Sequence, residues 1–125
     1  MILADASVWI DHFRADDAEM RVFLGNDQIV MHPFVIAELA LGSLHDRSKT
    51  LAQLDRLPQA QVAQIDEVRM MIEAHKLYSK GIGLIDAHLV ASCLMMLDTQ
   101  LWTRNSRLAG VAKALGVNAL VPTVN

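Results

Sequence analysis

Strand-like segments alternate with helix-like segments along the whole chain. Short apolar runs typical of strands occupy residues 2–5, 28–31, 61–65, 100–103 and 119–121. Apolar residues recur at helical spacing over residues 7–15, 17–25, 33–42, 47–57, 66–79, 86–97 and 106–115. This alternation predicts an α/β fold, specifically a three-layer α/β/α domain with a mostly parallel central sheet of about four to five strands. No linker or repeat divides the 125 residues, so residues 1–125 are expected to form a single domain.

Local signals predict where several helices begin. Ser7 and Asp66 are expected to cap the helices that follow them, and Pro33 suits a first helical position. The segment from Asp86 to about Leu97 is apolar on nearly every side. A helix of that kind is buried, and we expect it at the centre of the domain.

The composition narrows the class of protein. The chain is 53% apolar, so it can bury a core. Its formal net charge of −3 gives no overall sign of affinity for nucleic acid, although its basic residues could still gather on one rim. The single cysteine, Cys93, excludes an intrachain disulfide and a cysteine-based zinc site. The start MILAD lacks the basic region of a signal peptide, and no apolar run is long enough for a bilayer. A cytoplasmic protein without a membrane association is therefore expected.

Three acidic residues stand alone among apolar neighbours. Asp5 ends the run MILA, Glu38 is the only charge in PFVIAELALG, and Asp86 is the only charge in GIGLIDAHLVASCLMML. A partly buried carboxylate is costly unless a partner compensates its charge. None of the three segments contains Arg or Lys, and hard cations prefer carboxylate oxygens. The pattern therefore predicts a site for Mg²⁺ or Mn²⁺.

The predicted topology brings these acids to one edge of the sheet. Asp5 ends the first strand, Glu38 lies one turn into the helix after the second, and Asp86 starts a helix. Asn105 follows the 100–103 strand by two residues. Ligand sites of parallel sheets form at the carboxyl ends of the strands. A metal held there would polarise a phosphoryl oxygen and activate a water as nucleophile.

Four motifs carry a resemblance to a known family. They read ILADASVWID, HPFVIAELALGS, IGLIDAHLVAS and LWTRNSRLAGVAKALG, and together they span residues 2–116. In this order and spacing they resemble the PIN domain, specifically the VapC-type toxins of bacterial toxin–antitoxin pairs. The resemblance implies a three-layer α/β/α fold, Mg²⁺- or Mn²⁺-dependent endoribonuclease activity and inhibition by a VapB-like antitoxin.

The family pattern also implies roles for individual residues. Asp5, Glu38 and Asp86 match its metal-binding acids, and Ser7 matches a small polar residue that supports the first acid. Asn105 stands where most members have a fourth acid. An asparagine can still offer a neutral oxygen as part of the catalytic set. It adds no charge, so a second metal should bind more weakly.

Each of these residues also has a purely structural interpretation. Asp5 and Asp86 could cap helices, Glu38 could pair with a distant arginine, and Asn105 could be a turn residue.

The residues next to Asn105 also have both functional and structural interpretations. Thr103 could orient water in the site or simply end a strand. Arg104 and Arg107 could contact phosphate or an antitoxin carboxylate, or remain solvated surface charges.

The leading hypothesis is an endoribonuclease toxin that cleaves a structured RNA, such as a tRNA or rRNA loop, by metal-activated water. Its expected partners are the RNA, an antitoxin that inserts a segment into the acid-lined groove, and a second copy of the chain. The alternative is a catalytically degenerate module that binds RNA or protein. A phosphatase of the haloacid-dehalogenase type would need a second aspartate two residues after Asp5, where this chain has Ser7.

Overall fold

The computed structural model describes residues 1–121. Within them the central sheet has three strands, β1 (Ile2–Ala4), β2 (Ile29–Val30) and β3 (Gln100–Trp102), in the order β2-β1-β3. Both pairs are parallel, with Leu3 of β1 opposite Val30 of β2 and Leu101 of β3. The carboxyl ends of the three strands therefore lie at the same edge of the sheet.

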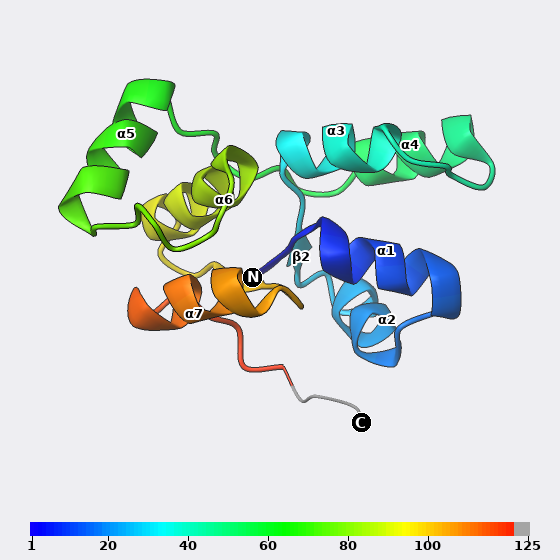
Figure 1. Cartoon of the computed structure of the whole chain (residues 1–125). Coiled ribbons are helices and arrows are strands. Elements are labelled where there is room, and N and C mark those ends of the chain that lie inside the picture. The colour runs from blue at the N-terminus through cyan, green and yellow to red at the C-terminus, as the bar shows by residue number, and fades with distance from the viewer. Residues whose placement is uncertain (122–125) are drawn as a thin grey trace.

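Helices lie on both sides of these strands (Figure 1). They are α1 (Ala6–Ala15), α2 (Ala18–Gly25), α3 (Pro33–Ala40), α4 (Arg47–Asp55), α5 (Ile65–Ala74), α6 (Leu84–Met95) and α7 (Ser106–Ala114). Helices α1 to α4 lie together on one side, with α1 and α4 both in contact with α3. Helices α5 to α7 lie on the other side, with α5 packed on α6. This arrangement confirms the predicted α/β fold.

The predicted number of strands is wrong for the described residues, because two segments form only isolated bridges. Residues 61–65 are not a strand; the bridge forms two residues earlier, between Gln59 and Met31. Residues 119–121 are not an edge strand either, since the bridge joins Asn118 to Leu101. Each segment meets the sheet at one position and then turns away, which periodicity alone does not reveal.

Hydrogen bonds also shift several helix ends. Asp5, not Ser7, caps α1, because its carboxylate accepts from the Val8 N–H. Helix α5 begins at Ile65 rather than after Asp66, with the Gln64 N–H donating to the Glu67 carboxylate. It ends at Ala74, five residues before its predicted end.

The core is built around the predicted central helix. All residues from Ala87 to Cys93 on α6 are buried, which confirms the prediction, although the helix begins at Leu84 rather than Asp86. Burial raises the pKa of the Cys93 thiol to about 12, so this side chain is an inert part of the core. None of the helices within residues 1–121 combines the length and apolar character that crossing a bilayer requires.

Candidate active site

Asp5 is the organising residue at the carboxyl edge of the sheet. It is buried, with 6% of its surface exposed, and directly follows β1. Its Oδ1 accepts hydrogen bonds from the Ser7 hydroxyl at 2.5 Å and from the Val8 N–H at 3.3 Å. Its Oδ2 accepts from the Thr103 hydroxyl. Ser7 in turn accepts from the Arg104 N–H at 3.0 Å, so the loop after β3 is attached to the first acid.

Glu38 and Asp86 lie near enough to interact electrostatically with Asp5. Burial raises the pKa of the Glu38 carboxyl above its ordinary value, and the charges of Asp86 and Asp5 raise it further. Burial likewise raises the pKa of Asp86, assisted by the charge of Asp5 and opposed by a 3.3 Å hydrogen bond from the Gly83 N–H. No ion pair within residues 1–121 neutralises any of the three acids. Together they make a negatively charged centre.

This centre has the donor chemistry of a Mg²⁺ or Mn²⁺ site. Its ligands would be hard carboxylate oxygens whose mutual repulsion a divalent cation would relieve. Within the described residues, however, no three His, Cys, Asp or Glu side chains lie close enough to hold an ion as they stand. The donor set fits such a cation, while the side chains would have to converge on it.

Asn105 acts in the structure as the N-cap of α7. Its Oδ1 accepts hydrogen bonds from the Arg107 N–H at 3.0 Å and the Leu108 N–H at 3.3 Å. Its own N–H donates to the Thr103 hydroxyl. Asn105 therefore has a structural role as a helix cap rather than as the turn residue that the sequence suggested, and a catalytic role stays a prediction.

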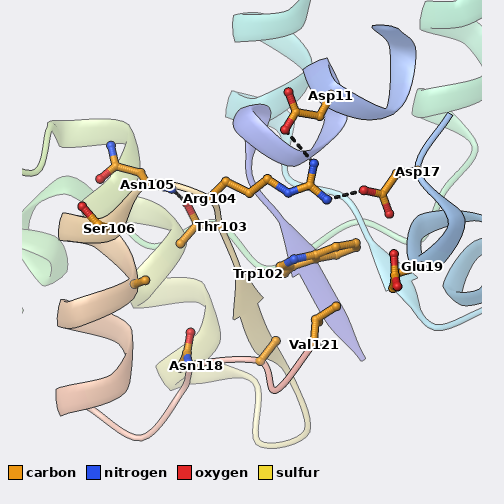
Figure 2. A pocket seen from close by; sticks show the side chains of 12 residues that line it. Asp11, Asp17, Glu19, Trp102, Thr103, Arg104, Asn105, Ser106, Asn118 and Val121 are labelled. Atoms are coloured by element: carbon orange, nitrogen blue, oxygen red, sulfur yellow. Dashed lines mark hydrogen bonds and ion pairs between the residues drawn. The ribbon is translucent and has the colours of Figure 1, made fainter. Parts of the chain in front are cut away.

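Arg104 lies between two aspartates rather than extending freely into solvent (Figure 2). Its guanidinium forms ion pairs with Asp11, at 2.6 Å, and with Asp17, and lies 5.6 Å from the ring centre of Trp102. Burial alone would raise the pKa of Asp17, but the hydrogen bonds from Arg104 and the Met20 N–H hold it below its ordinary value. These contacts join the loop after β3 to α1 and α2. A phosphate or antitoxin contact for Arg104 stays a prediction, and it would require release from these aspartates.

The two aspartates that pair with Arg104 were not predicted from the sequence to be site residues. Asp11 and Asp17 sit on polar positions of α1 and at the start of α2, where acidic residues are ordinary. They line a cavity of about 600 Å³ that also includes Arg104 and Asn105 (Figure 2). Asp5, Glu38 and Asp86 do not line it, so this cavity lies beside the acidic centre and is not the same site.

Glu38 faces a separate cavity of about 350 Å³. Its walls include Ile10, Phe13 and Leu39, and Arg14 also lines it. Ile10 and Phe13 remain 45% and 41% exposed, which leaves an apolar surface next to the carboxylate. This cavity thus combines apolar walls with one acidic and one basic side chain, Glu38 and Arg14.

The comparisons with known proteins agree with this architecture. The model of the PIN domain family matches residues 2–114. Two relatives, each named Ribonuclease VapC32, come from Mycobacterium tuberculosis strains CDC 1551/Oshkosh and ATCC 25618/H37Rv. Each is 43% identical to this chain over 117 residues, which cover 94% of this chain and 94% of the relative. The chain therefore belongs to the PIN domain family and is of the VapC type, which confirms the resemblance seen in the four motifs.

Proposed function

We propose that this chain, acting as a single domain over residues 1–125 in the cytoplasm, is a Mg²⁺- or Mn²⁺-dependent endoribonuclease toxin. The observation that carries the proposal is the group of three electrostatically coupled acids, Asp5, Glu38 and Asp86, without a basic partner among the described residues. The names of the VapC32 relatives support ribonuclease chemistry for such a site.

Asp5, Glu38 and Asp86 would hold the cation, and Asn105 could contribute a neutral oxygen from the cap of α7. When bound, Mg²⁺ or Mn²⁺ supplies positive charge at the phosphoryl group and lowers the pKa of water in the site. Ser7 and Thr103 donate to Asp5 and thereby fix the orientation of its carboxylate.

Glu38 would also act on the nucleophile. No described residue donates a hydrogen bond to the Glu38 side chain, so its oxygens are free to orient an attacking water. Attack of that water on an RNA phosphodiester would leave a 5′-phosphate and a 3′-hydroxyl. A structured RNA, such as a tRNA or rRNA loop, is the proposed substrate, because the chain has few basic residues for indiscriminate binding.

The proposed inhibitor is a VapB-like antitoxin. An amphipathic segment could place apolar residues between Ile10 and Phe13 and direct a basic side chain toward Glu38. Such a segment would exclude metal and RNA together. A homodimer is proposed as well, because several large apolar side chains are exposed.

Metal removal tests the function directly. We expect purified protein to cut total bacterial RNA into discrete fragments with Mg²⁺ or Mn²⁺ and to be inactive in EDTA, with activity restored by excess metal. Gel analysis with end mapping measures this result. Cleavage that persists at full rate in EDTA would contradict the proposal.

A second candidate function is supported by a specific observation. Within residues 1–121 no three ligands are gathered for a metal, and the Asn105 oxygen already caps α7. Both features suit a degenerate PIN domain that binds RNA or protein without cleaving it. Isothermal titration with Mn²⁺ separates the two candidates, because a degenerate site would show no binding at millimolar concentrations.

Replacing Asn105 by aspartate should restore the fourth acid of the family pattern. Aspartate caps helices as well as asparagine does, so α7 should be unaffected. The added charge should increase cleavage several-fold at limiting Mn²⁺ and have little effect at saturating Mn²⁺. Asn105→Ser, which preserves a capping oxygen without adding charge, is the matched control. An unchanged metal dependence in Asn105→Asp would exclude position 105 from the metal site.

A further inference from the structure

A basic pocket lies between the α5–α6 loop and α7. Its volume is about 370 Å³, and its polar lining includes His75, Lys76, Lys80, Ser106 and Arg107. Apolar residues of the loop and of α7 complete the wall, and none of the described residues that line the pocket is acidic. Positive charge is thus concentrated at one place in a chain whose net charge is −3.

The positive charges of this pocket have no ion-pair partners in the described part of the chain. Among residues 1–121, neither Lys76, Lys80 nor Arg107 takes part in an ion pair. Arg104 differs, because Asp11 and Asp17 already neutralise it. An uncompensated group of cations around a concave surface favours the binding of an anion.

The loop is folded to bring these side chains together. Lys76, Ser79 and Gly81 all have left-handed backbone conformations, with φ of 54°, 61° and 78°. Arg107 lies against Gly81 so closely that a Cβ on Gly81 would be 2.8 Å from its Cδ and 2.9 Å from its Nη1. The absence of a side chain at Gly81 therefore allows the arginine to lie across the loop.

Both walls of the pocket are connected to the acidic centre through the chain and its hydrogen bonds. On α7, Ser106 and Arg107 directly follow Asn105, whose backbone is tied through Thr103 to Asp5. The α5–α6 loop continues to Gly83, whose N–H donates to Asp86. A polymer with phosphates at regular intervals could occupy both places at once.

We propose that Lys76, Lys80 and Arg107 form a subsite for a backbone phosphate of the RNA substrate, next to the phosphodiester held at the carboxylates. The proposal rests on the proposed ribonuclease function, because that function defines RNA as the ligand. Arg107 can donate two parallel hydrogen bonds to a phosphate, and the lysines add charge from the opposite wall. An acidic peptide would satisfy the charges of the pocket but lacks the phosphodiester that a metal held at the carboxylates would bind.

The test compares two triple variants of equal charge change. The pocket variant is Lys76→Gln, Lys80→Gln and Arg107→Gln; the control is Lys49→Gln, Arg56→Gln and Lys113→Gln, three exposed basic residues that do not line the pocket. Filter binding of total bacterial tRNA is measured in EDTA, where metal-dependent cleavage is absent, over a range of KCl concentrations. Cleavage of the same RNA is then measured with Mn²⁺.

The wild type should show the steepest salt dependence. Loss of three phosphate charges should reduce the slope of log K against log salt by about 2, which corresponds to about 100-fold weaker binding at 0.1 M salt. The control should retain most of the affinity. In cleavage, the pocket variant should raise KM with kcat within a few-fold of the wild type.

Each other outcome has a defined meaning. Equal losses of tRNA affinity in the two triple variants would indicate a general charge effect and overturn the subsite. Displacement of bound tRNA by poly-L-glutamate at equal charge concentration would also overturn it. Unchanged affinity in the pocket variant with normal Mn²⁺-dependent cleavage would overturn the subsite and leave the ribonuclease intact. Pocket-dependent binding by a wild type that never cleaves would support the RNA subsite and contradict the nuclease function.

Discussion

Asp86→Asn is expected to reduce RNA cleavage by more than about 100-fold while leaving the fold intact. Loss of a group that merely orients a metal ligand reduces metal affinity or activity about 10- to 100-fold, and loss of a ligand itself should reduce activity further. The amide oxygen of asparagine can still accept the hydrogen bond from Gly83, so the start of α6 is preserved. Burial and the neighbouring charge of Asp5 raise the pKa of Asp86, so its ionised form is disfavoured in the folded state. The variant should therefore be at least as stable as the wild type at neutral pH.

Two measurements on the same samples check this expectation. Cleavage of bacterial RNA with Mn²⁺ gives the activity, and urea unfolding gives the free energy of unfolding. Asp55→Asn, on the exposed surface of α4, provides a control with the same chemical change. Full activity in Asp86→Asn would remove this carboxylate from the mechanism, whereas a destabilised variant would show that Asp86 is mainly structural.

Acid should destabilise the protein through His32. This side chain is fully buried, and its Nδ1 accepts a hydrogen bond from the Phe34 N–H at 3.0 Å, which caps the helix that carries Glu38. Its Nε2 has no hydrogen-bond partner among the described residues. Burial lowers the pKa of His32 from 6.5 to about 4, and the nearby His88 contributes in the same direction. The folded protein therefore holds His32 in the neutral form.

The direction of the pH effect follows from proton binding. Between pH 6.5 and about 4 the unfolded chain binds a proton at His32 that the folded chain does not. The free energy of unfolding should therefore decrease as the pH falls through this range, by on the order of 3 kcal/mol from this residue. Well above pH 6.5 both states are neutral at this position and the effect vanishes.

Urea unfolding at a series of pH values measures this contribution. His32→Asn keeps a capping side chain without a titrating ring, so its stability should depend less on pH between 6.5 and 4. Any packing loss in this variant is common to every pH and does not affect the comparison of slopes. His45→Asn, on an exposed histidine, should retain the wild-type slope. Identical slopes in His32→Asn and the wild type would contradict the assignment.

The regular parts of the fold could be predicted because their signals are local. The central position of α6 followed from a segment with almost no polar face, and all of its residues from Ala87 to Cys93 are buried. The strands β1, β2 and β3 were placed within a residue or two at each end. The two bridges at Gln59 and Asn118 were not predicted, because their pairing depends on neighbours far away in the chain.

In the candidate site, too, some features could be predicted from the sequence and others depended on the tertiary structure. The isolation of Asp5, Glu38 and Asp86 among apolar residues marked them as special, and the structure places them within electrostatic reach of one another. The sequence could not show that Thr103 would donate to Asp5 from 98 positions away. Nor could it show that Arg104 would be neutralised by Asp11 and Asp17, since ion pairing depends on which surfaces meet.

The sequence alone determined the alternation of strands and helices, the family motifs and the identity of the three acids. These depend on local periodicity and on the high cost of an unpaired charge among apolar residues. Only the tertiary structure decided that Thr103 donates to Asp5, that Gly81 makes room for Arg107, and that Lys76 and Lys80 face the same pocket as Arg107. Those relations arise when distant segments pack together, and hydrogen bonds and charges act over distances in space that the order of residues does not specify.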